Sequence, residues 1–198
     1  MIEAATENYD LKVKILQQLD AVLAPEVLVA TNTSSISITK LAAVTKRAEQ
    51  FIGMHFFNPV PMMALVEVTS GLQTSAATCE EIESIARKLG KTPVKLKNSP
   101  GFVVNRLLVP MINEAIFTLA DGVATATDID EAMKLGANHP IGPLALADLI
   151  GLDVTLAIMQ VLYNSFNDSK YRAAPLLVEM VEAGYLGRKS GRGFFSYN

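Results

Sequence analysis

The stretch FIGMHFFNPVPMMALVEVTS, residues 51–70, decides how this chain folds. An apolar run ends at His55, a turn follows at Asn58-Pro59, and a second strand-like run carries Glu67. Because a turn with two prolines folds the chain back, we expect the side chains of His55 and Glu67 to meet. An acid that holds one ring nitrogen of a histidine leaves the other free to exchange a proton. The stretch therefore predicts an acid–base pair.

Strand and helix patterns alternate on both sides of this stretch. Strand patterns occur at IEAAT (2–6), VLVAT (27–31), IGMHF, ALVEV and TPVKL (92–96), and helical patterns at 10–23, 38–44 and 79–89. Such alternation predicts an α/β domain over residues 1–98, with a largely parallel, Rossmann-like doubly wound sheet and helices packed on its faces.

Residues 99–198 have helical rather than strand patterns and predict a mostly α-helical C-terminal domain. A long helical pattern follows SPGF and stops at Gly122, with Pro110 inside it, so a kink or a helix start is expected there. Thr127 and Asp130 resemble a capping box that starts the next helix. Further helical stretches are expected at 144–163 and 176–183, and the tail GRKSGRGFFSYN predicts a glycine-punctuated turn.

Composition excludes several classes of protein. Of the 198 residues, 50% are hydrophobic and 19% are charged, which predicts a folded globular chain. The net charge of −3 and the lack of a basic run argue against a nucleic-acid partner. No apolar run reaches the ~18 residues that span a bilayer, and the N-terminus lacks a signal-peptide layout, so we expect a cytoplasmic protein without a membrane partner. The single cysteine, Cys79, excludes an internal disulfide and multi-cysteine metal sites.

The glycine-rich turn of dinucleotide-binding sheets is missing from these residues. Such sheets open with a strand, a G-x-G-x-x-G turn and a helix. The only glycine-rich run, GRKSGRG near the end, follows a helical pattern and precedes no helix. Since the chain begins in what looks like the end of a strand, we expect a sheet whose opening strands are absent.

Five blocks together identify a family resemblance. The segments NTSSISIT, GMHFFNPVP with LVEV, NSPGFVVNRLLVP, KLGANHPIGP and GRKSGRGFFSY are similar to those of the 3-hydroxyacyl-CoA dehydrogenases. Among these, the chain most resembles the bacterial short-chain branch, the 3-hydroxybutyryl-CoA dehydrogenases. The resemblance covers essentially the whole chain, and it implies that residues 1–98 are the C-terminal part of the NAD-binding domain. Residues 99–198 would then be the C-terminal dimerisation and substrate domain.

The resemblance implies roles for the catalytic residues. His55 matches the family's base, which takes the C3 hydroxyl proton of a hydroxyacyl thioester as hydride leaves for NAD. Glu67 matches the acid that orients it and stabilises the imidazolium. Ser34 matches the serine near the reacting oxygen and the nicotinamide. Asn105 matches the asparagine that positions the substrate near its thioester.

The same resemblance implies the cofactor contacts. Glu7 and Lys12 match residues near the ribose, Ser34 and Asn58 lie near the nicotinamide, and Lys189 reaches the cofactor region. NAD is the implied cofactor, with NADP as the alternative, and no metal is implied. The implied partners are an acyl-CoA substrate and a second copy of the chain, in a homodimer formed through the helical domain.

Structural roles compete with these assignments. Asn32 and Ser34 follow a strand and could cap the next helix, which would not prevent them from binding a ligand. Asn105 could instead satisfy a backbone group at the Pro110 kink. Glu7, Lys12 and Lys189 could be surface charges. His139, which precedes a proline in ANHPIGP, is interpreted as structural.

Three functions follow for the chain. The leading one is an NAD-dependent 3-hydroxyacyl-CoA dehydrogenase. The second is a non-catalytic dimerisation fragment of that enzyme, because pyrophosphate normally sits on the glycine turn and the helix behind it. On that ground we expect the isolated chain to be inactive and to bind NAD poorly. The third, another hydroxyacid dehydrogenase of similar architecture, is disfavoured because such enzymes typically use a lysine where this chain has His55.

Overall fold

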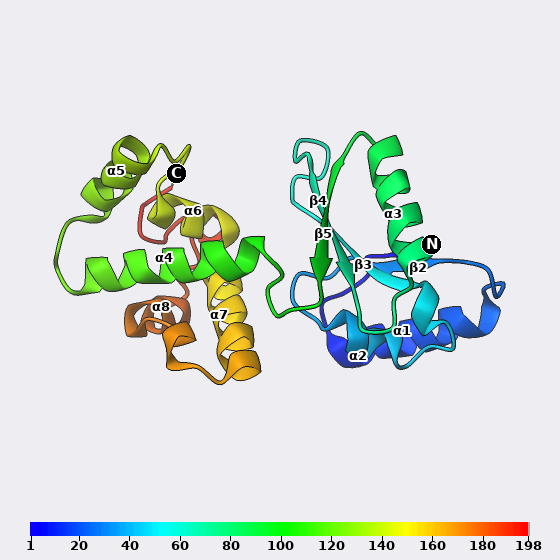
Figure 1. The fold of residues 1–198 in the computed structure, drawn as a ribbon. Coiled ribbons are helices and arrows are strands. Elements are labelled where there is room, and N and C mark those ends of the chain that lie inside the picture. The colour runs from blue at the N-terminus through cyan, green and yellow to red at the C-terminus, as the bar shows by residue number, and fades with distance from the viewer. Residues whose placement is uncertain (198) are drawn as a thin grey trace. The chain divides into compact units, whose positions relative to one another are not determined.

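The computed structural model describes residues 1–197, and the chain divides into two compact units, Met1–Val103 and Val104–Asn198. Unit 1 combines a sheet with helices, and unit 2 is helical (Figure 1). This confirms the predicted order of an α/β part followed by a mostly helical part. The division falls directly after the SPGF turn, where the helical texture of the sequence begins.

Unit 1 contains a five-stranded sheet in the order β1-β2-β3-β4-β5. Its strands are β1 (Ile2–Glu3), β2 (Val29–Thr31), β3 (Phe51–Phe56), β4 (Leu65–Ser70) and β5 (Thr92–Lys97). Its helices are α1 (Tyr9–Val22), α2 (Ile38–Ala42), the 3-10 turn η1 (Ala48–Gln50) and α3 (Ala76–Lys88). Strands β3 and β4 pair antiparallel, and the other neighbours pair parallel. The sheet is therefore largely parallel, as the alternation of patterns predicts.

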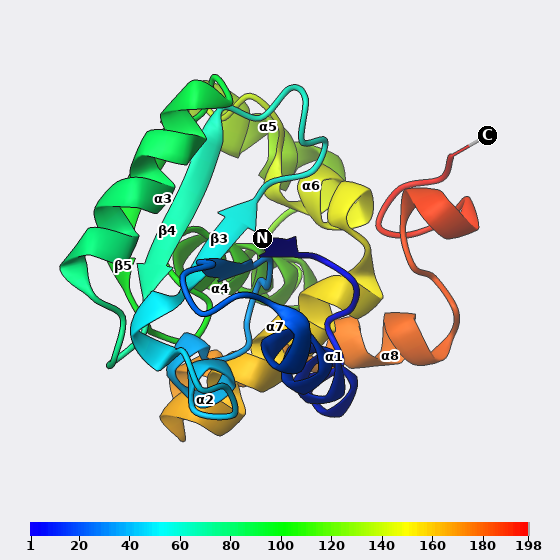
Figure 2. The same ribbon diagram turned by 90° about the vertical axis from the view of Figure 1, so that its right-hand side faces the viewer.

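Two apolar layers cover the two faces of this sheet. Helices α1 and α2 lie on one face and α3 on the other (Figures 1 and 2). Phe51 packs with residues of α1 and α2, whereas Ile52 and Met54 pack with residues of α3. Neighbouring side chains of a strand point to opposite faces, which explains the split. Gly53 lies where α2 approaches closely, since a Cβ there would come within 2.7 Å of the Cδ1 atom of Ile38.

A buried ion pair joins β1, α1 and β2. The Lys12 ammonium is 2.5 Å from Oε2 of Glu3, and the two side chains are 0% and 2% exposed. The same ammonium donates to Oγ1 of Thr31 at 3.2 Å, and the Thr31 hydroxyl donates to Oε2 of Glu3 at 2.7 Å. The backbone N–H of Ala5 donates to the other carboxylate oxygen. Each charge thus has several partners, which offsets the cost of taking both out of water.

Unit 2 is built around one long helix. Its helices are α4 (Val104–Ala120), α5 (Ala126–Ala137), α6 (Pro143–Ile150), α7 (Leu152–Phe166) and α8 (Pro175–Glu182), with 3-10 turns η2 (Ser169–Tyr171) and η3 (Arg188–Ser190). Helix α4 contacts α5, α6, α7 and α8 (Figure 1). Its Ile112 and Ile116 lie in the main apolar cluster. Pro110 lies inside α4, which continues on both sides of it.

The start of α5 differs from the sequence-based expectation. The capping residue of α5 is Thr125, not Thr127: its Oγ1 accepts from the backbone N–H of Asp128 and donates to that residue's carboxylate. Asp130, the expected partner of Thr127, instead caps α6 by accepting from the backbone N–H groups of Leu144 and Ala145. An aspartate stands three residues after Thr125 and also three residues after Thr127, so this spacing does not distinguish the two threonines. The contact of Asp130 with α6 does.

The predicted helix over 144–163 is also wrong, because it is two helices. They meet at Gly151, which has φ 104° and ends α6. Only glycine adopts this conformation readily, which allows the chain to turn sharply at this position. The angle of the bend between α6 and α7 is 97°. Within residues 1–197 no single helix is long and apolar enough to cross a membrane, although α6 and α7 pass together by length and composition.

The Glu3–Lys12 pair predicts a pH-dependent stability. Burial alone raises the pKa of the Glu3 carboxyl, but hydrogen bonds from Lys12, Thr31 and Ala5 outweigh it, so the pKa lies below its ordinary value of 4.5. Because the pKa is lower in the folded state than in the unfolded state, the ionised Glu3 stabilises the fold above about pH 4.5. This stabilisation is lost as the pH falls through the folded-state pKa. Replacing one partner of a buried pair costs on the order of 3–5 kcal/mol. Glu3→Gln should therefore lower the free energy of unfolding at pH 7.

Urea unfolding at a series of pH values measures this effect. The gap between wild type and Glu3→Gln should narrow below pH 4.5. Glu80→Gln, at an exposed glutamate on α3 of the same unit, is the control and should change stability by less than ~0.5 kcal/mol. A gap that stays constant down to pH 3 would contradict the assignment.

Candidate active site

His55 and Glu67 form a cross-strand pair between β3 and β4. The antiparallel register places the two residues directly opposite each other, so their side chains share one face of the sheet. Nδ1 of His55 lies 2.8 Å from Oε2 of Glu67. The residues are 6% and 1% exposed. The predicted contact is confirmed.

This contact determines which nitrogen of His55 is available for chemistry. With Glu67 as a carboxylate, the Nδ1–H donates to Oε2, and the lone pair of the neutral ring lies on Nε2. The other oxygen of Glu67, Oε1, accepts from the backbone N–H of Val103 at 3.1 Å. A proton taken up at Nε2 would give an imidazolium held against a carboxylate. The pair can therefore act as a general acid–base group.

Aromatic rings surround the imidazole of His55. The ring centroid of Phe57 is 4.5 Å away and that of Phe102 is 5.7 Å away. Phe102 has φ 50°, a left-handed conformation that is strained for a residue with a side chain. Its buried ring packs in the apolar layer of α1 and α2, which holds it there. The low-dielectric wall strengthens the interaction between His55 and Glu67.

The segment after β2 is shaped by Glu7. One carboxylate oxygen of Glu7 accepts from the Thr33 hydroxyl at 2.8 Å and from the backbone N–H groups of Ser34 and Ser35 at 2.9 and 3.1 Å. The Ser35 hydroxyl adds a fourth bond at 3.1 Å. Within the described residues, Oε2 of Glu7 and the hydroxyl of Ser34 have no hydrogen-bond partner. Both remain available to a ligand at this edge of the sheet.

The other predicted contacts of unit 1 differ in exposure. Asn58 is exposed in the turn after β3, next to a cis Asn58–Pro59 peptide bond. Lys12 is fully buried in its pair with Glu3, and its ammonium also donates to the backbone oxygen of Asn32 at 3.4 Å. Of these two side chains, only that of Asn58 presents itself to solvent.

Two predicted residues belong to unit 2. Asn105 is half-buried in the first turn of α4. Lys189 lies in η3, and its ammonium is 2.6 Å from Oδ2 of Asp153, near the start of α7. Burial alone raises the pKa of Asp153, but the hydrogen bond from Lys189 helps to bring it below its ordinary value. Lys189 therefore already holds one carboxylate within its own unit.

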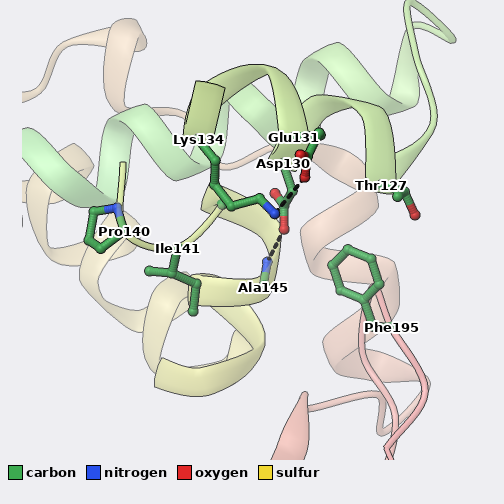
Figure 3. Close-up of a pocket in the computed structure, with 9 residues that line it drawn as sticks. Thr127, Asp130, Glu131, Lys134, Pro140, Ile141, Ala145 and Phe195 are labelled. Carbon is green, nitrogen blue, oxygen red and sulfur yellow. Dashed lines mark hydrogen bonds and ion pairs between the residues drawn. The ribbon is translucent and has the colours of Figure 1, made fainter. Parts of the chain in front are cut away.

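A pocket of about 340 Å³ lies between α5 and α6 (Figure 3), and none of its lining residues is a predicted site residue. Its charged groups are already paired, because Asp130 caps α6 and Lys134 is bonded to Glu131. Among residues 1–197, no group of three or more His, Cys, Asp or Glu side chains could hold a metal ion.

The sequence did not predict the contacts of two residues at the site edge. Thr33 binds Glu7, and the side chain of Asn32 binds the backbone of Phe56. Both stand in the NTSS motif and both are polar residues directly after a buried strand. Their position directly after a strand could have indicated these contacts. A helix-capping role, however, accounts for polar residues at that position equally well.

Comparisons with known proteins place this geometry among relatives. Residues 1–99 match the family described as "3-hydroxyacyl-CoA dehydrogenase, NAD binding domain", and residues 101–197 match "3-hydroxyacyl-CoA dehydrogenase, C-terminal domain". A 3-hydroxybutyryl-CoA dehydrogenase of Clostridioides difficile is 58% identical over 198 residues, covering 100% of this chain and 70% of the relative. One of Bradyrhizobium diazoefficiens is 58% identical over 197 residues, covering 100% and 67%.

A solved structure agrees with these relatives. The crystal structure of (S)-3-hydroxybutyryl-CoA dehydrogenase PaaH1 from Ralstonia eutropha superposes with a TM-score of 0.98 at 66% identity. It is matched over 100% of this chain and 70% of its own. The likeness thus extends over both units of the chain.

The hydrogen bonds of Glu7 predict an ordered segment at residues 33–35. Glu7→Ala removes the acceptor, so the amides of Ser34 and Ser35 should exchange with solvent about tenfold faster, equivalent to ~1.4 kcal/mol. Glu7→Gln keeps an acceptor oxygen and should retain most of the protection. Hydrogen exchange followed by NMR measures both, with the Ile52 amide of β3 as the internal reference. Equal exchange in wild type and Glu7→Ala would contradict the role given to Glu7.

Proposed function

Because this chain belongs to the 3-hydroxyacyl-CoA dehydrogenase family, we propose that it interconverts 3-hydroxybutyryl-CoA and acetoacetyl-CoA with NAD. The family supports the reaction class and the cofactor. The short acyl chain is supported by the names of the relatives from Clostridioides difficile and Ralstonia eutropha. The observation that carries the proposal is the buried His55–Glu67 pair, with Nδ1 bound and Nε2 left for the substrate.

The residues at the edge of the sheet fit a cofactor with ribose and nicotinamide groups. Oε2 of Glu7 accepts hydrogen bonds, and the Ser34 hydroxyl both donates and accepts. Such groups suit a ribose diol and a reacting oxygen. NAD, when bound, supplies the hydride acceptor. Asn58, exposed in the turn after His55, is proposed to lie near the nicotinamide.

The acid–base steps belong to His55. In oxidation, its Nε2 takes the proton of the C3 hydroxyl as C3 loses hydride, and Glu67 stabilises the resulting imidazolium. In reduction, the same nitrogen returns the proton to the forming hydroxyl. Ser34 is proposed to bind the reacting oxygen, and Asn105 to position the substrate near its thioester. Lys189 is proposed to contact the cofactor.

The competing functions have less support. A non-catalytic dimerisation fragment is not favoured, because relatives named as dehydrogenases match over the whole length of this chain. A lysine-dependent hydroxyacid dehydrogenase is not supported either. In unit 1, the buried Lys12 is engaged with Glu3 at 2.5 Å, whereas Nε2 of His55 is available for proton exchange.

Replacing the base tests the proposed function. In a reconstituted full-length enzyme, His55→Gln keeps a polar side chain of similar size but removes the proton exchange, so kcat for acetoacetyl-CoA reduction should fall on the order of 10²–10⁴-fold with little change in KM. Glu67→Gln should also lower kcat, because a neutral partner stabilises the imidazolium less. Oxidation of NADH at 340 nm follows the reaction. His139→Gln, at the other histidine of the chain, is the control.

Two outcomes would count against this function. Unimpaired turnover by His55→Gln would mean that the proton comes from another group. A similar loss in His139→Gln would mean that the effect is not specific to the pair.

Homodimer formation through unit 2 is the second part of the proposal. A largely apolar groove of about 420 Å³ lies along α4 and α5, lined by Met111, Ala115, Val123 and Met133 among others. Val123 is 72% exposed within the single chain. Apolar surface of this kind usually marks an association site.

Light scattering coupled to size exclusion tests the dimer at micromolar concentration. Wild type should have twice the mass of the chain. Met133→Glu places a charge in the groove and should shift the protein towards monomer. Leu72→Glu, at an 86% exposed leucine of unit 1, should leave the dimer intact. A monomeric wild type would rule out this assembly.

A further inference from the structure

Asn32 connects three elements at the edge of the sheet where the proposed active site lies. Its backbone N–H donates to the carbonyl oxygen of Glu3, the last residue of β1, at 2.7 Å. Its own carbonyl oxygen accepts from the Lys12 ammonium of α1 at 3.4 Å. Its side-chain Oδ1 accepts from the backbone N–H of Phe56 in β3 at 2.9 Å.

The bond to Phe56 lies beyond the end of the β2–β3 ladder. The parallel pairing of these strands ends at Thr31 and Gly53, whereas β3 continues to Phe56. Past Thr31 the chain turns away into residues 33–35, which Glu7 holds. No backbone carbonyl of β2 pairs with Phe56, so its half-buried N–H needs another hydrogen-bond acceptor. The Asn32 amide oxygen takes the place of the missing ladder acceptor.

The hydrogen bond between Asn32 and Phe56 lies next to the residues of the proposed active site. Phe56 directly follows His55, and Ser34 lies two residues after Asn32. We propose that Asn32 is a positioning residue that fixes His55 relative to the Ser34 segment by extending the sheet through its side chain. This inference rests on the proposed dehydrogenase function for its catalytic consequence, but not for the bond itself.

The same arrangement gives Lys12 an indirect role. Its ammonium is fully buried and held by Glu3, and it reaches the site edge only through the carbonyl oxygen of Asn32. The buried pair therefore anchors the backbone of Asn32, and the side chain of Asn32 anchors the end of β3. Lys12 supports the site through Asn32.

Substitutions at Asn32 separate the hydrogen bond from the size of the side chain. Asn32→Leu keeps the bulk and removes the acceptor, whereas Asn32→Asp keeps an acceptor oxygen. Asn32→Ala serves where the leucine variant fails to fold. The matched control is Asn98→Leu, because Oδ1 of Asn98 likewise accepts from a backbone N–H, that of Ile38, at 2.8 Å.

Two readouts are followed: NMR hydrogen exchange of the Phe56 amide, and the kinetics of acetoacetyl-CoA reduction by NADH in a reconstituted full-length enzyme. In Asn32→Leu the Phe56 amide should exchange about tenfold faster. The value of kcat should fall on the order of 10- to 100-fold, since a misplacement of about 1 Å can cost that much, with KM nearly unchanged. Asn32→Asp should restore both readouts. Asn98→Leu should speed exchange at Ile38 and leave the Phe56 amide and kcat unchanged.

The outcomes distinguish the inference from the proposed function. An unchanged Phe56 amide in both Asn32→Leu and Asn32→Ala would overturn the role of Asn32, as would equal kinetic losses in Asn32→Leu and Asn98→Leu. Absence of turnover in the reconstituted full-length wild-type enzyme would count against the proposed function alone. In that case the Phe56 exchange rate and the NMR resonance of the His55 ring, which should shift in Asn32→Leu but not in Asn98→Leu, still decide whether Asn32 fixes the end of β3.

Discussion

The backbone ladder between β3 and β4 sets His55 opposite Glu67, and the candidate site depends on this register. A slip by one residue would move every side chain of one strand to the other face of the sheet. The slip is opposed by the apolar layers, because Met54, Val66 and Val68 are fully buried against α3. The same alternation that buries the core therefore brings a base and an acid to 2.8 Å on the opposite face. Core packing and site geometry are two consequences of one pairing.

Three carboxylates organise the edge of unit 1 in different ways. Glu67 is almost completely buried and binds both His55 and the backbone of Val103. Glu3 is buried and neutralised by Lys12, which ties β1 to α1. Glu7 is exposed and gathers the backbone N–H groups of the segment after β2. Because hydrogen bonds to an ionised acceptor are stronger than those between neutral groups, each acid can hold a piece of irregular backbone in place.

Unit 2 uses buried polar side chains for the same purpose. The carboxylate of Asp148, 1% exposed, accepts from the backbone N–H groups of Phe194 and Phe195 and from the hydroxyl of Tyr197, so it fastens the tail to α6. Asn113, 3% exposed in α4, binds the backbone of residues 172 and 174. Buried polar groups are costly unless they are bonded, and here each one fixes a loop against a helix. These loops therefore have defined positions although they lack regular structure.

The sequence alone determined the order of strands and helices, the α/β and helical parts, and the contact between His55 and Glu67, since periodicity and a proline turn act over short distances. It did not determine that Leu144–Tyr163 breaks at Gly151, that Thr125 caps α5, or that Lys12 is fully buried. Local patterns leave such alternatives close in free energy. The choice was made by partners distant in sequence: Asp130 capping α6 across 14 residues, and Asn32 reaching Phe56 across 24. Only the tertiary structure brings those partners together, and the burial that comes with it makes an unpaired polar group too costly to leave.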